Sequence, residues 1–540
     1  MSSAVAVRTA GAAADAVSRH LPTLVGDRVA SRLAEQDPTL WGPAVAADAA
    51  VRLSWVDLAR SSRPLLTEVA ALRDRLRGLG LDHVVLCGMG GSSLAPEVIS
   101  RTAGVELTVL DSTDPDQVRA ALADRLDRTV VVVSSKSGTT AETDAGRRAY
   151  EQAFAAAGLD PRERIVVVTD PGSALEELAL AAGYVVVRAD PHVGGRYSAL
   201  SAFGLVPSGL AGADLARLLD EAEAARPALV RDDPANPALL LGAALGGTAP
   251  LRHFVVLVED PASGQRLAGF ADWAEQLLAE STGKAGTGLL PVVVEDGHAP
   301  DAVGPCPDAL VVELGPAESG QQPFGEPASG LRVTGPLGAQ LLLWELATAV
   351  AARLLRINPF DQPDVESAKV AARGLLDDRP ETPAPAFVEA GIEVRASAGL
   401  LDGVHDLPGA VDALLGRLGP SGYLAVMAYL DRHSDAALTD VRAALARRTR
   451  RPVTFGWGPR FLHSTGQFHK GGLATGVFLQ ITGAPAADLP VPDRPFTFGE
   501  LIAAQAQGDA QVLAARGRPV LRLHLTDRAA GIARLCEVLA

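Results

Sequence analysis

Residues 84–98 read VVLCGMGGSSLAPEV, an apolar run that passes through three glycines and two serines into a helix-like segment. This order predicts a buried strand, a tight glycine turn and a helix. The glycines allow backbone amides to approach a ligand closely, and Ser92 and Ser93 lie where the helix should begin. Glycine-rich turns at helix N-termini bind anions, so the stretch predicts a phosphate-binding loop. A tight turn without a ligand is the alternative.

Four more valine-rich runs follow, each separated from the next by a stretch of helical length. Continuous apolar strands that alternate with helices predict a parallel sheet covered on both faces, here over about 80–210. The runs are ELTVLDS (106–112), TVVVVSS (129–135), RIVVVTD (164–170) and YVVVRAD (184–190).

The remaining chain divides by composition. Residues 1–60 are rich in Ala, Leu and Arg and should be helical, ahead of a first α/β unit at 61–230. A second α/β unit is expected at 231–376. The proline-rich stretch DDRPETPAPAF predicts a linker at 377–390, and further α/β layering follows at 391–540.

Composition narrows the classes of function. The chain has 540 residues and a net charge of −15, which argues against a general grip on nucleic acid but not against a small anionic substrate. Three cysteines without a C-x-x-C pattern argue against a disulfide framework or a cysteine zinc site. The longest apolar stretch, 338–355, contains Glu345 and Arg353, so no membrane span is expected. The N-terminus shows no signal-peptide pattern, and a cytoplasmic protein is expected.

A second polar loop, SSKSGTTAET (134–143), follows one of the predicted strands. Ser135, Ser137 and Thr140 could donate hydrogen bonds to phosphate oxygens, and Lys136 would add positive charge. Ligands bind at the carboxyl ends of strands in open α/β sheets, so two such loops favour a small phosphorylated metabolite.

The same loop also has a structural interpretation. Thr139 and Glu142 fit a capping box that would start the next helix. Serines and threonines often cap helices without binding anything, and this role is the alternative for the loop as a whole.

Candidate acid–base residues follow in the second unit. Gln276 and Glu280 of GFADWAEQLLAESTGK (269–284) are four apart and share a helix face. A carboxylate at the mouth of a pocket can move a proton between adjacent carbons; a solvated surface glutamate is the alternative. Arg196 follows two glycines and could stabilise an oxyanion or pair with a structural acid. Lys369 ends INPFDQPDVESAK (357–369), which also fits a capped helix start with an exposed lysine.

Together these stretches resemble the phosphoglucose isomerase family, whose members are built from two sugar isomerase domains. The resemblance covers about 60–370 in the order of the family. It implies an α/β fold with two sugar isomerase domains, each a parallel sheet flanked by helices. The motifs that carry it are GMGGSSLAP (88–96), SSKSGTTAET (134–143), GGRYSALSAFGL (194–205), WAEQLLAESTGK (273–284) and NPFDQPDVESAK (358–369).

The resemblance implies a role for each matching residue. Glu280 is similar to the base that shuttles a proton between C1 and C2, and Arg196 to the residue that stabilises the enediolate. Lys369 resembles the lysine that assists at the sugar ring. The residues expected to bind substrate are Gly91, Ser92, Ser135, Lys136, Ser137, Thr140, Gly195, Gln276 and Gln362.

The ring-opening histidine does not follow the family order. Between Glu280 and Lys369 the chain offers His298, which does not match the family pattern. LHSTGQ at 462–467 resembles the family's LHS-x-GQ segment and puts His463 in the catalytic place; a structural histidine is the alternative. His469 is expected to be a neighbour. The resemblance thus implies a rearranged C-terminal part, at 391–540, that completes the second domain, in an order similar to the isomerase part of transaldolase–isomerase fusions.

The function implied is reversible isomerisation of glucose 6-phosphate and fructose 6-phosphate through a cis-enediol, with no metal or organic cofactor. There are two alternatives: an isomerase that also accepts mannose 6-phosphate, and a sugar-phosphate sensor without catalysis. Retention of Glu280, Arg196 and Lys369 together favours an enzyme. The family commonly completes its site with a partner subunit's histidine, so a homodimer is expected, although the moved segment also allows His463 to come from the same chain.

Overall fold

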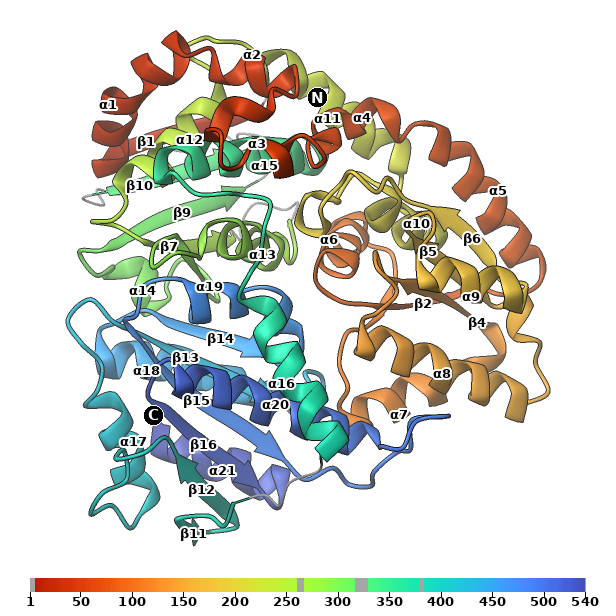
Figure 1. Ribbon diagram of the computed structural model, residues 1–540, viewed down its shortest axis with the longest axis vertical. Helices are drawn as coiled ribbons and strands as arrows, with labels where there is room; N and C mark the ends of the chain where they lie inside the picture. The colour runs from red at the N-terminus through yellow and green to blue at the C-terminus, as the bar shows by residue number, and fades with distance from the viewer. Residues whose placement is uncertain (1–4, 260–266, 316–328, 379–382, 540) are drawn as a thin grey trace.

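The computed structural model describes residues 5–259, 267–315, 329–378 and 383–539. Strands in these ranges form three sheets, and each sheet is the centre of one α/β unit (Figure 1). The α/β fold with parallel sheets flanked by helices, predicted from the valine-rich runs, is confirmed.

The first unit has an all-parallel sheet with the strand order β3-β2-β4-β5-β6. Leu86 and Val132 face one hydrophobic cluster, and Val85 and Val131 face another, so both faces of the sheet are buried. This explains why the strands are continuously apolar. The elements are α5 (Pro64–Gly78), β2 (His83–Gly88), α6 (Leu94–Ala103), β3 (Thr108–Leu110), α7 (Pro115–Ala123), β4 (Thr129–Ser134), α8 (Ala141–Ala156), β5 (Ile165–Thr169), α9 (Ala174–Ala182), β6 (Val185–Arg188), α10 (Ala202–Ala211) and α11 (Leu215–Leu229).

The second unit has the strand order β1-β10-β9-β7-β8. All pairings are parallel except that of β1 with β10. Its strands are β1 (Ala6–Gly11), β7 (Phe254–Glu259), β8 (Leu290–Val293), β9 (Ala309–Gly315) and β10 (Ser329–Thr334). Its helices are α1 (Ala12–Gly26), α12 (Pro237–Thr248), α13 (Phe270–Thr282), α14 (Pro300–Val303), α15 (Leu337–Leu355) and α16 (Val365–Asp378), and the short helices α2 (Val29–Ala34), α3 (Ala46–Ala49) and α4 (Leu58–Ser61) precede the first unit.

The expectation of an entirely helical N-terminal segment is wrong at β1. This strand lies at the edge of the second sheet and pairs antiparallel with β10 along its whole length. Its alanine-rich sequence has no strong strand preference, but tertiary pairing overrides such weak local preferences.

The C-terminal unit has a six-stranded sheet of its own, with the order β11-β12-β16-β15-β13-β14. It therefore adds no strand to the sheet of the second unit, although strands of both units share one hydrophobic cluster that includes Val256, Val311, Tyr423 and Phe478. Its elements are β11 (Phe387–Glu389), β12 (Ile392–Ala396), α17 (Leu407–Leu415), β13 (Tyr423–Tyr429), α18 (Val441–Thr449), β14 (Val453–Trp457), α19 (Gly466–Gly471), β15 (Gly476–Gly483), α20 (Phe498–Ala515), β16 (Val520–Leu525) and α21 (Arg528–Leu539).

Two long helices tie the units together. Among the described residues α15 is the helix that is long and apolar enough to cross a membrane, but 89% of its most apolar window is buried inside the protein, as in a core helix.

Helix α16 leaves the second unit and packs along α20 of the C-terminal unit (Figure 1). The expected linker at 377–390 contains the end of α16 and strand β11.

The turn that follows β2 packs directly against the turn that follows β6. These turns are the 3-10 helices η3 (Gly90–Ser92) and η6 (Gly195–Tyr197). A Cβ atom on Gly91 would lie 1.9 Å from the carbonyl oxygen of Gly195, which no real contact allows. Glycine at position 91 is therefore a condition for bringing the two turns together.

We predict that Gly91→Ala destabilises the protein by about 1–3 kcal/mol, because the added methyl group must push the two turns apart. Gly78→Ala is the matched control, since a Cβ there meets no atom within 4 Å. The control should keep or slightly raise the stability, as alanine is favoured over glycine in a helix. Unfolding in urea measures both variants, and equal stabilities would contradict the prediction.

Candidate active site

A cavity of about 520 Å³ lies where the three units meet. Turns after β2, β4 and β6 line part of it, and α13, the segment that leads into α16, α16 itself and the segment around His463 line much of the rest. Every residue proposed from the sequence as catalytic or substrate-binding lines this cavity. These residues are Gly91, Ser92, Ser135, Lys136, Ser137, Thr140, Gly195, Arg196, Gln276, Glu280, Gln362, Lys369 and His463.

The hydroxyl groups of the first unit gather on one side of this cavity. Ser92 lies in η3, after β2, and Ser135 and Thr140 follow β4. The hydroxyl oxygens of Ser135 and Thr140 are 3.2 Å apart, and the amide of Gly138 donates to Ser135 Oγ over 3.1 Å. The loop is thus a compact set of neutral hydrogen-bond donors, suited to an oxyanion.

Lys136 lines the same cavity, but its charge is already compensated. Its ammonium group forms an ion pair with Asp170 and donates to the carbonyl oxygen of Pro191 over 3.0 Å. Burial raises the pKa of the Asp170 carboxyl, while Lys136 opposes this effect. Lys136 therefore offers less free positive charge than the sequence suggested.

The capping box expected at Thr139 and Glu142 is wrong. Helix α8 begins one residue later than that box requires, with Thr140 as N-cap and no side-chain cap bond. The Glu142 carboxylate points elsewhere: Oε1 accepts from Gln505 Nε2 over 2.7 Å and lies 3.3 Å from His463 Nε2. Burial opposes ionisation of Glu142, but the hydrogen bond to His463, its charge and that of Lys369 together outweigh burial and lower the pKa of the carboxyl.

Glu280 lies in the last turn of α13 and is almost enclosed, with 9% of its surface exposed. Arg196 Nη1 is 3.4 Å from Glu280 Oε1, and Gln276 Nε2 donates to Glu280 Oε2 over 3.2 Å. The helical spacing read from the sequence thus places Gln276 and Glu280 on one face. A cation and an amide hold the two carboxylate oxygens in place.

Arg196 also holds the segment that contains Gln362. It donates to Gln362 Oε1 over 2.8 Å and to the carbonyl oxygens of Pro359 and Asp361 over 2.7 and 2.9 Å. Such a buried, multiply bonded guanidinium keeps one orientation. The turn around Gln362 and the end of α13 therefore move as one body.

Lys284, to which the sequence assigned no role, holds the segment that contains Asp361 and Asn358. Its ammonium group donates to Asp361 Oδ1 over 2.7 Å and to the carbonyl oxygen of Asn358 over 2.8 Å. Burial and the nearby Arg196 lower the pKa of Lys284 to about 8. The available signal was its position at the end of the motif WAEQLLAESTGK.

His463 ends the 3-10 helix η8 (Arg460–His463), and its side chain is 13% exposed. Its carbonyl oxygen accepts from Gln276 Nε2 over 2.8 Å, and the same amide nitrogen contacts Glu280. A Cβ atom on Gly90 would lie 3.0 Å from His463 Cβ, so the glycine turn touches the histidine. One side chain, Gln276, therefore connects the carboxylate and the imidazole-bearing segment within a single chain.

The two other histidines considered from the sequence, and Lys369, differ from His463 in their burial and contacts. His469 is buried, its Nδ1 is 2.9 Å from the Tyr423 hydroxyl, and burial holds its pKa well below the usual range. His298 does not line the cavity. Lys369 does line it, and its side chain is 44% exposed, with Glu366 3.9 Å away.

Glu275 lies next to Gln276 on α13 and contacts Ser464, the residue after His463. Its Oε1 accepts from Ser464 Oγ over 2.7 Å. Burial, and then the nearby Asp272, raise the pKa of Glu275 to about 8. The Glu275 carboxyl is therefore largely protonated at neutral pH.

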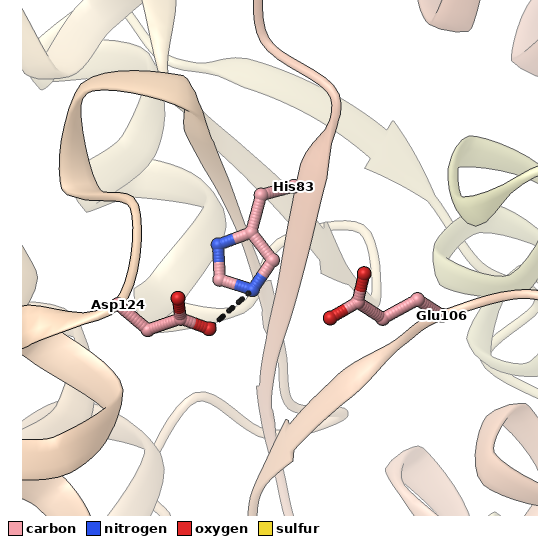
Figure 2. A group of neighbouring side chains, drawn as sticks. All are labelled: His83, Glu106 and Asp124. Carbon is pink, nitrogen blue, oxygen red and sulfur yellow. Dashed lines mark ion pairs between the residues drawn. The ribbon is translucent and has the colours of Figure 1, made fainter.

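His83, Glu106 and Asp124 form the one group of possible metal ligands found among the described residues (Figure 2). Arg125 donates to Glu106 over 3.0 Å and to Asp124 over 2.8 Å, so both carboxylates already have a cationic partner within the protein. His83 Nδ1 lies 2.8 Å from the Thr129 hydroxyl. These contacts favour a structural cluster outside the cavity.

The chain matches proteins of known family. The model of the family described as Phosphoglucose isomerase matches residues 74–287. A probable glucose-6-phosphate isomerase of Natronomonas pharaonis is 31% identical over 358 residues, which cover 58% of this chain and 83% of that protein. A glucose-6-phosphate isomerase of Thermus thermophilus is 32% identical over 389 residues, which cover 60% of this chain and 90% of that protein.

Two solved structures resemble this chain in fold. A hypothetical protein of Thermus thermophilus superposes with a TM-score of 0.58 at 27% identity and covers 68% of this chain and 99% of its own. A glucose-6-phosphate isomerase of Chlamydia trachomatis superposes with a TM-score of 0.53 at 20% identity, over 68% of this chain and 86% of its own, which indicates a shared fold.

We predict that Glu275 makes the folded protein less stable as the pH rises from about 4.5 to about 8. The folded state keeps a proton there that the unfolded chain releases, so unfolding becomes easier by about 1.4 kcal/mol per pH unit from this group. Glu275→Gln should remove that part of the slope. Urea unfolding at pH 5, 6 and 7 measures it.

The control is Glu68→Gln, an exposed glutamate on α5, which should leave the slope unchanged. An equal slope for wild type and Glu275→Gln would show that the Glu275 carboxyl is ionised at neutral pH.

Proposed function

The chain belongs to the phosphoglucose isomerase family, and from that premise we propose that it interconverts glucose 6-phosphate and fructose 6-phosphate through a cis-enediol. The observation that carries this proposal is the convergence of Glu280 and His463 on one cavity, bridged by Gln276. The cavity of about 520 Å³ has a size common for small-ligand sites and suits a six-carbon monophosphate.

Substrate binding begins at the phosphate. The hydroxyls of Ser92, Ser135, Ser137 and Thr140 line one end of the cavity and donate to the phosphate oxygens. This assignment is supported by the position of the loops after two parallel strands, where ligands of such sheets bind. Gln276, Gln362 and the glycine turns then contact the sugar hydroxyls.

Ring opening follows, with His463 as the proton carrier. The carboxylate of Glu142 is 3.3 Å from His463 Nε2, and Gln505 fixes that carboxylate in turn. A carboxylate partner selects the tautomer and the orientation of an imidazole. His463 moves the proton between the anomeric hydroxyl and the ring oxygen, and Lys369 assists from α16.

Isomerisation then needs one base and one stabilising cation. Glu280 removes the proton from C2, the enediolate forms while Arg196 balances its charge, and Glu280 returns the proton to C1. The hydroxyl proton moves between the two oxygens in the same step. All protons return to the substrate and no electrons leave it, so the proposal requires neither a metal nor an organic cofactor.

The cellular location, the oligomeric state and a second substrate are part of the same proposal. We propose a cytoplasmic enzyme, because its charged substrate does not cross a membrane unaided. A homodimer remains part of the proposal, but His463 reaches the cavity from the same chain as Glu280, so the partner is not needed for this residue. An additional activity on mannose 6-phosphate depends on the cavity wall near C2.

We predict that Glu280→Gln lowers kcat for fructose 6-phosphate at least about 100-fold, because general acid–base groups contribute about 100- to 10,000-fold. The amide keeps the shape of the side chain, so the KM should change little. Coupled measurement of glucose 6-phosphate formation tests this, with Glu68→Gln as control. A sensor without catalysis would give no product from either wild type or variant.

We predict that His463→Ala impairs closed-ring substrate about 100-fold but an open-chain analogue, which lacks the ring-forming hydroxyls, only a few-fold. The reason is that the analogue omits the step assigned to the imidazole. Equal loss on both substrates would contradict the ring-opening role.

Mixing inactive variants completes this test. Refolding Glu280→Gln together with His463→Ala should not restore activity, since each cavity takes both residues from one chain. Recovered activity would instead show that His463 comes from a partner subunit.

A further inference from the structure

Arg460 begins the 3-10 helix that ends at His463, and its side chain is 13% exposed. Its Nη1 donates to Asp111 Oδ2 over 2.6 Å, and its Nη2 lies 2.7 Å from Glu97 Oε2. Asp111 follows β3 and Glu97 lies on α6, so both carboxylates belong to the first unit. A guanidinium of the C-terminal unit is thus held by two acids of another unit.

The same acids connect to the turn that follows β2. The single hydroxyl proton of Ser93 is shared between Asp111 Oδ2 at 3.3 Å and the carbonyl oxygen of Gly90 at 3.2 Å. Asp111 Oδ2 therefore accepts from Arg460 and from Ser93 at once. A continuous set of polar contacts runs from the glycine turn beside Ser92 to the helix that carries His463.

The charges in this cluster are strong and enclosed. Burial opposes ionisation of Glu97, but Arg460 and Arg432 outweigh it and hold its pKa at about 2. Arg432 Nη1 donates to Glu97 Oε1 over 3.1 Å. Charge-assisted hydrogen bonds of this kind are short and directional, and they fix the groups that they join.

We propose that Arg460, through Asp111 and Glu97, is the positioning residue for His463, setting the imidazole against the phosphate-binding turns of the first unit. The inference rests on the proposed function, in which the first unit holds the phosphate and the C-terminal unit supplies the ring-opening group. These two parts lie on different sheets, so their relative placement needs a contact between units. A misplacement of about 1 Å can cost about 100-fold in rate.

The other contacts of His463 hold it to the first unit less firmly, since Gly90 packs against it without a hydrogen bond. Gln276 holds its carbonyl oxygen to α13, which belongs to the second unit. Glu142 belongs to the first unit, but it contacts the ring of His463 at 3.3 Å and not its backbone. Arg460 is three residues away on the same helical turn and fixes that backbone.

The test compares Arg460→Met with Arg442→Met. Arg442 is 3% exposed and also bridges two acids across units, Glu295 at 2.6 Å and Asp301 at 2.5 Å, but far along the chain from His463. Each variant loses a buried, paired guanidinium, so general destabilisation should be similar. A difference between them reports on the position of His463.

Two steps are measured separately. Interconversion of the anomers of glucose 6-phosphate reports ring opening, and exchange of the C2 proton of an open-chain analogue reports proton transfer by Glu280. Arg460→Met should slow ring opening about 100-fold and proton transfer less than about threefold. Arg442→Met should change neither rate by more than about threefold. Equal effects of the two variants on ring opening would overturn the proposal.

Asp111→Asn keeps the test valid if Arg460→Met does not fold. It preserves the shape of the acid that joins Arg460 and Ser93, and it should show the same selective loss of ring opening. An unchanged ring-opening rate in Asp111→Asn would count against the proposal in the same way.

A wild-type protein without isomerase activity would defeat the proposed function but not this inference. The His463 ring signals of protein labelled with 15N-histidine, assigned with His463→Gln, then decide. They should shift in Arg460→Met and stay unchanged in Arg442→Met; unchanged signals in both would reject the positioning role.

Discussion

The amide of Gln276 is the contact on which the cavity depends. Its nitrogen donates to the Glu280 carboxylate and to the backbone of His463, so it sets the separation of two groups that come from different units. Its Oε1 is buried and has no hydrogen-bond partner among the described residues. A buried acceptor left unpaired costs about 1–3 kcal/mol, so a substrate hydroxyl that donates to it would be bound favourably. Gln276, which holds Glu280 and His463 in place, is therefore also suited to bind a hydroxyl group of the sugar.

Three cationic side chains at or near the cavity are already paired with acidic groups or carbonyl oxygens of the protein. Lys136 is paired with Asp170, Lys284 with Asp361, and Arg196 holds three acceptors in the segment around Gln362 while facing Glu280. In the proposed function, these three side chains leave the phosphate mainly to hydroxyl groups and backbone amides, and Arg52 and Lys369 are the further cations that line the cavity. This division explains how a chain with a net charge of −15 can hold an anion, since neutral donors aimed at one point do not require an excess of basic residues.

Local sequence patterns predicted the features of the fold that depend on residues close together in the chain. The strand, glycine turn and helix at 84–98, and the shared face of Gln276 and Glu280, follow from spacing alone. Pairings between distant residues could not be predicted in this way. Glu142 fitted a capping box by spacing, yet its partners His463 and Gln505 are more than 300 positions away. Strand β1 was missed for the same reason, because its pairing with β10 exists only in the folded chain.

A site is defined by positions in space and not by the order of its residues along the chain. The segment FLHSTGQFHKGG follows Lys369 in sequence, but it packs directly against the end of α13. Gln467 donates to the carbonyl oxygen of Gly283 over 2.9 Å and to Asp364 Oδ2 over 2.8 Å. A Cβ atom on Gly283 would lie 2.6 Å from Phe468, so the two segments are in close contact. The segment thus supplies packing that holds the helical turn of His463 against the end of α13, and the ion pairs of Arg460 join the same turn to the first unit.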